Sequence, residues 1–305
     1  MSDRRYRQPL PLGGEDGLPF SKGLMARALI AAGLPTDRAY ELALAVEADL
    51  AARARPTTTI ERLEEVAREI FGPDEGSAAM QRVRRYRDLY ELDLPIILLV
   101  GGATGTGKST VATDVAYRLG ITRVTSTDYV RQTMRAFFSS EFMPAIHHSS
   151  FEAGRALAGD DDRPDAETVL DGFLQQTREV LVGVRAAIDR ALEEGWSMVL
   201  EGVHLVPGML PKQIEGALVV QCVLSISDPD AHAGHFWIRD SDSEGVRPYE
   251  KYVDAFDDIR SIQTYILGRA RKHEVPVIEN GNIEAAIAEV MELVLTAAQP
   301  APVAS

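Results

Sequence analysis

The sequence predicts an α/β protein in which a doubly wound parallel sheet follows a small, mostly helical domain. From residue 95 onward, short apolar runs alternate with amphipathic helical patterns, the order expected of a parallel sheet with crossover helices. A glycine-rich segment joins the first strand to the first of these helices, where such sheets bind their ligands. Before residue 93 the periodicity is mainly helical. The 305 residues have room for both domains, which we place at 1–92 and 93–305.

Apolar runs predict five strands, and helical periodicity predicts the helices between them. The strands are expected at 95–101, 121–126, 197–201, 218–226 and 275–279. Helices are expected at 107–119, 129–138, about 165–195, 250–273 and 283–298. In the N-terminal domain we expect a helix between Ser21 and Gly33, a second after Asp37, a third after Thr59 and a fourth at 79–92.

The segment GGATGTGKST, residues 101–110, follows the apolar run 95–100. From Gly102 to Ser109 it has the spacing of a phosphate-binding loop, in which Gly, four residues, Gly, Lys and Ser come between a strand and a helix. Such a loop turns its backbone N–H groups toward the phosphates of a nucleoside triphosphate. We therefore expect a sheet of the P-loop NTPase type, like that of nucleoside monophosphate kinases, with ATP and Mg²⁺ as cofactors.

Each polar residue of this loop has an expected role. Lys108 is placed to reach the β- and γ-phosphates, the Ser109 hydroxyl to bind Mg²⁺, and Thr110 to face the α-phosphate. The predicted ATP-binding residues are Gly102, Ala103, Thr104, Gly105, Thr106, Gly107, Lys108, Ser109, Thr110 and Arg247.

Two carboxylates follow strands that would end beside the phosphate loop. Asp128 follows the second strand and is expected to orient an acceptor hydroxyl or accept its proton, while the alternative is that it caps the next helix. Glu201 ends the third strand and is expected to hold Mg²⁺ or the acceptor. His204, three residues later, is equally well explained as a hydrogen-bonded structural histidine.

Arginines are candidates for binding anions. Arg131 and Arg135 follow Asp128 at helical spacing and are expected to grip an anionic acceptor. His147 and His148 would add donors, and we consider a metal pair there the weaker interpretation. Beyond the fourth strand, Arg239 and Arg247 are lid candidates that would neutralise the transferring group, with a charged surface loop as the alternative.

Composition limits the partners. The net charge of −14 argues against nucleic-acid binding over a broad face. The single cysteine, Cys222, lies in the apolar run 218–224, where a buried and inert thiol is expected. Because the sequence shows neither a targeting segment nor a stretch long enough to span a membrane, we expect a cytoplasmic protein. The sequence leaves a homo-oligomer open.

Several longer segments resemble the 2-phosphoglycerate kinase family. The resemblance covers most of residues 93–295 and rests on the runs at 121–131, 141–147, 150–154, 257–263 and 275–280. The N-terminal part, with Pro19-Phe20-Ser21-Lys22 and the helices after it, is similar to the ATP-cone, a nucleotide-binding regulatory module also fused to kinases of this family. That similarity implies a nucleotide effector at the N-terminal domain.

The family resemblance implies transfer of the ATP γ-phosphoryl group to the 3-hydroxyl of 2-phosphoglycerate, giving 2,3-bisphosphoglycerate and ADP. In this hypothesis Lys108, Asp128 and Arg239 are catalytic. Two alternatives stay open: a kinase of another anionic alcohol, such as an inositol phosphate or a sugar acid, and a nucleotide-responsive regulatory protein. Asp128 and the arginines after it distinguish a kinase from a regulatory protein, because a protein that only responds to nucleotide needs no acceptor pocket.

Overall fold

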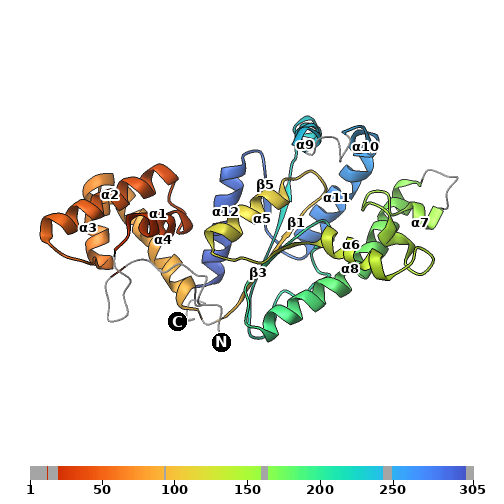
Figure 1. Ribbon diagram of the computed structural model, residues 1–305. Helices are drawn as coiled ribbons and strands as arrows, with labels where there is room; N and C mark the ends of the chain where they lie inside the picture. Colours follow the sequence, from red (N-terminus) through yellow and green to blue (C-terminus); the bar gives the residue numbers. More distant parts are fainter. Residues whose placement is uncertain (1–11, 13–19, 93, 159–163, 243–248, 300–305) are drawn as a thin grey trace. The chain divides into compact units, whose positions relative to one another are not determined.

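The computed structural model describes residues 12, 20–92, 94–158, 164–242 and 249–299 (Figure 1). A five-stranded, all-parallel sheet has the strand order β2-β3-β1-β4-β5. The strands are β1 (Ile96–Gly101), β2 (Val124–Ser126), β3 (Met198–Glu201), β4 (Leu218–Ser225) and β5 (Val277–Glu279). The predicted parallel sheet is thereby confirmed.

The central strand is apolar because both of its faces are covered. All six residues of β1 are buried, as expected for a parallel strand with helices on each side. Its register pairs Val100 with Glu201 of β3 and with Cys222 of β4. The carboxyl end of β3 therefore lies beside the start of the phosphate loop, and β4 continues past it to Ser225.

The helices of the sheet-containing part largely follow the expected boundaries. They are α5 (Lys108–Arg118), α6 (Thr127–Phe137), α7 (Arg155–Ala158), α8 (Ala166–Glu193), α9 (Pro229–Asp242), α10 (Tyr249–Asp254), α11 (Phe256–Lys272) and α12 (Ile283–Ala297), with a 3-10 turn, η1, at Pro144–His147.

Helices α8 and α11 pack on one face of the sheet, and α5 and α12 lie along the other (Figure 1). The core under α8 joins Val180 and Val184 to Leu99 and Leu200 of the sheet. A second cluster joins Phe173 of α8 to the α11 residues Ile259, Ile262 and Ile266. This core fixes the strand ends from which the site is built.

Some expectations differ from the structure. Arg239, expected in a mobile lid segment beyond the fourth strand, lies in helix α9, and the expected helix 250–273 is interrupted at Ala255. Only Val124–Ser126 of the expected strand 121–126 pairs, because β2 is an edge strand whose one neighbour, β3, has four residues. Helix α6 begins at Thr127, two residues earlier than expected.

The N-terminal helices are α1 (Lys22–Ala31), α2 (Thr36–Arg53), α3 (Ile60–Phe71) and α4 (Pro73–Glu91). All four were expected, although α4 begins earlier because Pro73 occupies a first-turn position where proline is favourable. The side chains of Ser21 and Thr59 cap α1 and α3.

By compactness the chain forms two units. One contains Leu94–Asp114 and Arg123–Val290, and the other contains the described parts of Ser2–Asp93, Val115–Thr122 and Met291–Ser305. Helices α5 and α12 therefore have residues in both units. Among the described residues, no helix is both long and apolar enough to cross a membrane.

Candidate active site

A pocket of about 700 Å³ opens above the carboxyl ends of β1, β2 and β3. The phosphate loop forms one wall, and Asp128 and Arg131 of α6 form another. Glu201 lies between them, and the loop residues Ser149 and Ser150 complete the side beyond α6. The structure therefore brings part of the phosphate loop together with Asp128, Arg131 and Glu201 in one pocket.

The carbonyl oxygens of the phosphate loop accept hydrogen bonds from Lys108 and from side chains of distant elements. Lys108 Nζ donates to Ala103 O at 2.6 Å, and the Asn280 side-chain amide donates to Thr106 O at 3.0 Å. His232 Nε2 donates to Thr104 O at 2.8 Å, and His235 Nδ1 donates to Gly105 O at 3.0 Å. A trans peptide carries its C=O and N–H on opposite sides, so the N–H groups of residues 105–107 point away from His232, His235 and Asn280. The loop is a preformed nest for anions.

Ser109 and Glu201 meet at the base of the pocket. The Ser109 hydroxyl donates to Glu201 Oε1 at 3.0 Å, and Glu201 is only 7% exposed. Both offer the hard oxygen ligands that Mg²⁺ prefers, and Mg²⁺ normally takes few protein ligands beside water and phosphate. Nowhere in the described part of the chain do three His, Cys, Asp or Glu residues gather as a metal cluster. The residues present therefore fit Mg²⁺ held jointly with a triphosphate.

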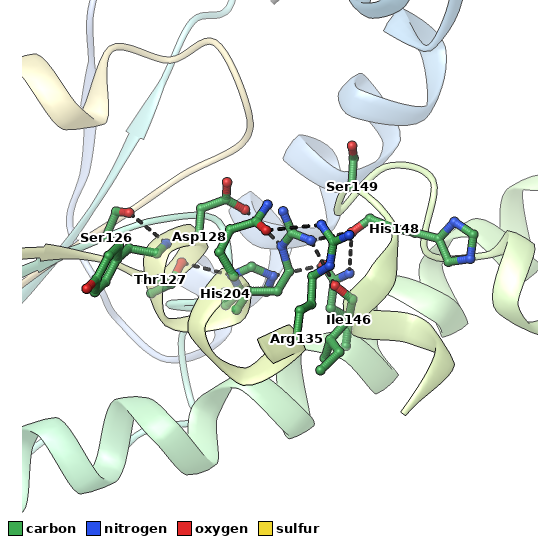
Figure 2. Close-up of polar contacts among 12 residues, drawn as sticks. Ser126, Thr127, Asp128, Arg135, Ile146, His148, Ser149 and His204 are labelled. Carbon is green, nitrogen blue, oxygen red and sulfur yellow. Dashed lines mark hydrogen bonds and ion pairs between the residues drawn. The ribbon is translucent and has the colours of Figure 1, made fainter. Parts of the chain in front are cut away.

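Asp128 lies in the first turn of α6 and does not cap it. The cap is Ser126, whose hydroxyl accepts from Tyr129 N at 3.0 Å, so the alternative of Asp128 as the cap is wrong (Figure 2). The Asp128 side chain is 61% exposed and lines the pocket, with Oδ1 accepting from Arg131 Nε at 2.9 Å. A carboxylate in this position faces the space beside the phosphate loop.

Arg131 and Arg135 differ in their surroundings. Arg131 is 4% exposed and its Nη1 donates to the carbonyls of Ile146 and His148, each at 2.8 Å. It therefore holds the acceptor-side loop as well as lining the pocket. Arg135 is exposed, bonds to Gln132 Oε1 at 3.0 Å and is not part of the pocket wall.

A buried polar chain supports this wall from behind. Gln176 Nε2 donates to Ala145 O at 2.6 Å and to His148 O at 3.1 Å, so its Oε1 faces His204 Nε2 at 2.9 Å. His204 Nε2 must then carry the proton, and Nδ1 accepts from the Thr127 hydroxyl at 2.8 Å. Burial lowers the pKa of His204 to about 3, so the ring is neutral. This is the hydrogen-bonded structural histidine that the sequence left open.

The remaining candidates lie at the edges. His147 Nε2 bonds to Phe138 O at 2.9 Å, and the carbonyl of His148, rather than its ring, holds Arg131. Arg239 lies in α9, four residues after His235. Arg247 lies outside the described residues. Cys222 is buried, and burial raises the pKa of its thiol to about 12, as expected for an inert cysteine.

The chain is similar over most of its length to 2-phosphoglycerate kinases. It is 39% identical to that of Methanothermobacter thermautotrophicus over 275 residues, which are 90% of this chain and 89% of the relative. It is 35% identical to that of Pyrococcus furiosus over 279 residues, 92% and 90% of the two chains. The chain belongs to the 2-phosphoglycerate kinase family. With the enzyme of Methanopyrus kandleri it shares 33% identity over 278 residues, 91% and 84% of the two chains. No family model matches the chain.

In this member of the 2-phosphoglycerate kinase family, the residues that hold the site in place could not be identified from the sequence. His232, His235 and Asn280 anchor the phosphate loop from more than 100 residues away, and Gln176 anchors the acceptor wall. Tyr252 of α10 also lines the pocket. Only the position of Asn280 at the end of a strand carried a signal, because ligands bind at such ends.

Proposed function

We propose that this protein transfers the γ-phosphoryl group of ATP to the 3-hydroxyl group of 2-phosphoglycerate, giving 2,3-bisphosphoglycerate and ADP. The observation that carries the proposal is the shared pocket of the phosphate loop and Asp128 in a chain of this family. A loop of inward N–H groups suits a triphosphate, and an arginine beside a carboxylate suits an anionic alcohol.

In the proposed reaction the acceptor oxygen attacks the γ-phosphorus from the side of Asp128. A bond forms between that oxygen and phosphorus, the bond from phosphorus to the β–γ bridging oxygen breaks, and ADP leaves with the electron pair. Asp128 orients the hydroxyl and accepts its proton. Lys108, the inward N–H groups and Arg239 stabilise the charge of the transferring group.

Ser109 and Glu201 are the residues that would hold Mg²⁺, directly or through water. The ion would neutralise charge on the phosphate oxygens when bound. The hydrogen bond between Ser109 and Glu201 supports this assignment, because it keeps both oxygen ligands at the base of the same pocket.

On the acceptor side, Arg131 is proposed to bind the carboxylate or phosphate of the substrate through Nη2, because Nε and Nη1 are taken by the protein. Ser149 and Ser150 line the same wall and offer hydroxyl groups. Arg135 and Arg247 stay proposed contacts, the first to the acceptor and the second to ATP. Arg135 would have to turn away from Gln132 to reach the pocket.

Three further proposals concern the whole protein: a nucleotide effector bound by residues 1–92, a homo-oligomer and a cytoplasmic location. Helices α1–α4 support the first, because the ATP-cone is mostly helical. The measured mass of the protein with and without nucleotide would test the oligomer.

The decisive experiment measures ADP release from Mg-ATP with 2-phosphoglycerate, 3-phosphoglycerate, gluconate and inositol phosphates, with products identified by mass. We expect turnover with 2-phosphoglycerate. Asp128→Asn is expected to lower kcat by about 100-fold or more and to leave the Kd for Mg-ATP within about threefold. Tyr129→Phe, at the 67% exposed neighbour in α6, is the matched control.

Other outcomes would overturn parts of the proposal. Turnover with a different acceptor alone would discard 2-phosphoglycerate and keep the kinase. Nucleotide binding without any acceptor-dependent turnover would favour the regulatory protein. Unchanged turnover of Asp128→Asn would remove this carboxylate from the mechanism.

A further inference from the structure

Three successive peptides of the phosphate loop each have, at one end, a glycine with positive φ. Gly105 has a φ of 86° and Gly107 a φ of 78°, both in the left-handed region that favours glycine. The peptides Thr104–Gly105, Gly105–Thr106 and Thr106–Gly107 each have one of these glycines at one end. Since glycine lacks a Cβ, it adopts backbone angles that a side chain would block, so each of these peptides has one end at which the backbone can rotate. A turned peptide would present its carbonyl oxygen, in place of its N–H, to the bound phosphates.

The same three peptides are those held by side chains from distant elements. His232 donates to Thr104 O, His235 to Gly105 O, and Asn280 to Thr106 O, at 2.8, 3.0 and 3.0 Å. Each bond fixes the direction of one loop carbonyl, and His235 and Asn280 also line the pocket. Three successive peptides with a glycine at one end are therefore each held by a side chain from a distant element.

The two histidines are fixed in the tautomers that this role needs. A carbonyl oxygen only accepts, so the proton must be on Nε2 of His232 and on Nδ1 of His235. His232 Nδ1 is then an acceptor, and Arg260 Nη1 of α11 lies 3.5 Å away while also donating to Ile226 O at 2.7 Å. His232 is fully buried, and Phe236, one helical turn after it, is fully buried against Gly105.

We propose that His232 and His235 are positioning residues that lock the phosphate loop of this kinase with its N–H groups inward. The proposal rests on the proposed function only in requiring that the loop bind a nucleotide. Helix α9 thereby has a second role, because the helix that carries Arg239 also fixes the loop on which the triphosphate would lie. Loss of a lock would let one peptide turn over and set a carbonyl dipole against the phosphates, which weakens nucleotide binding.

The test uses His235, which is half-buried, so that its variants fold. His235→Asn keeps an amide N–H at the place of Nδ1, while His235→Leu has a similar size and no donor. Titration calorimetry with Mg-ADP and with Mg-ATP gives the Kd for each. In His235→Leu the turned peptide would no longer donate its N–H to the phosphates. We expect the Kd to rise by about 10- to 100-fold, the range for a lost hydrogen bond to a charged ligand. The Kd of His235→Asn is expected to stay within about threefold of that of the natural protein.

The buried residue is tested in parallel. His232→Gln keeps an N–H at the place of Nε2 and His232→Leu does not. We therefore expect His232→Leu to raise the Kd and His232→Gln to leave it nearly unchanged. Trp237→Ala is the control, because Trp237 lies in α9 and is 64% exposed. The melting temperature of each nucleotide-free variant separates a locking role from general destabilisation, which would lower it equally for Leu and amide variants.

The outcomes are distinguishable. Equal Kd values for His235→Leu and the natural protein would overturn the lock. Equal weakening by Asn and Leu would also overturn it and point to direct contact between the ring and the phosphates. A natural protein that binds neither nucleotide would overturn the proposed function and the lock together, whereas binding without acceptor turnover would overturn only the proposed function.

Discussion

At the scale of single residues, His204 shows how burial sets the chemistry of a side chain. Both ring nitrogens have partners, Thr127 and Gln176, and the side chain is fully buried. Its pKa is lowered to about 3, first because burial disfavours the charged ring and then through the nearby cations Arg131 and Lys108, while the charge of Asp128 acts in the opposite direction. Protonation of His204 would place a positive charge on a fully buried ring.

This pKa predicts a loss of stability in mild acid. The folded-state pKa of His204 lies below the unfolded value of about 6.5, so the unfolded chain binds the proton first and stability is lost as the pH falls from 6.5 toward 3. Between pH 7 and pH 5 the loss from this residue is about 2 kcal/mol. Urea unfolding of the natural protein and of His204→Gln, at both pH values, measures it. Gln keeps the donor to Gln176, and an equal pH dependence of the two proteins would contradict the assignment.

Sequence analysis could identify the site residues that directly follow the strands. Lys108, Ser109, Asp128 and Glu201 all line the pocket because strand ends meet at one edge of a parallel sheet. Partners such as His232 and Gln176 could not be found in this way. They act through their position in helices far along the chain, and only the three-dimensional packing brings them to the site.

At the scale of elements, apolar runs located the strands because a sheet covered on both faces needs continuous apolar residues. Helix α9 was missed although its start carried a signal. Asp228 Oδ1 accepts from Asp230 N at 2.9 Å, and Pro229 occupies the first position of the helix. The acidic and polar residues from Asp240 onward outweighed this signal and led to the expectation of a loop.

The approach of α8 to the acceptor-side loop gives a prediction at this scale. A Cβ at Gly172 would lie 2.5 Å from the carbonyl group of Ala153, a rigid backbone neighbour. Gly172→Ala is therefore expected to destabilise the protein by about 1–3 kcal/mol. The segment 149–154 would also shift, raising KM for the acceptor more than KM for ATP. Urea unfolding and steady-state kinetics measure the two effects.

Gly268→Ala in α11 is the matched control for Gly172→Ala. No heavy atom lies within 4 Å of the added methyl group, so the helical preference of alanine is expected to raise stability by about 0.5–1 kcal/mol. Equal effects of the two substitutions would show that the backbone contact of Gly172 has no influence on the loop.

At the scale of the whole molecule, the unit of N-terminal helices includes parts of the C-terminal chain. Arg85 of α4 donates to Glu292 Oε1 at 2.7 Å and to Thr296 Oγ1 at 2.8 Å, both in α12. Arg27 lies over the ring of Tyr117, 5.6 Å from its centroid. Helices α5 and α12 therefore each begin in the unit that holds the phosphate loop and end in the unit that holds α1–α4.

This sharing predicts that residues 93–305 alone are less stable than the full chain. Val294 and Leu295 of α12 are buried and belong to the same compact unit as α1–α4, and exposing side chains of this size costs about 1.5–3 kcal/mol each. Thermal unfolding of the 93–305 fragment is expected at a lower temperature than that of the sheet unit in the full chain. Arg85→Ala is the control, because an ion pair at the surface contributes at most about 1 kcal/mol. A fragment that unfolds at the same temperature as the full chain would support a boundary after residue 92. A fragment that unfolds much earlier than Arg85→Ala would show that apolar packing of α5 and α12, and not the ion pair, makes the phosphate-loop unit depend on the N-terminal helices.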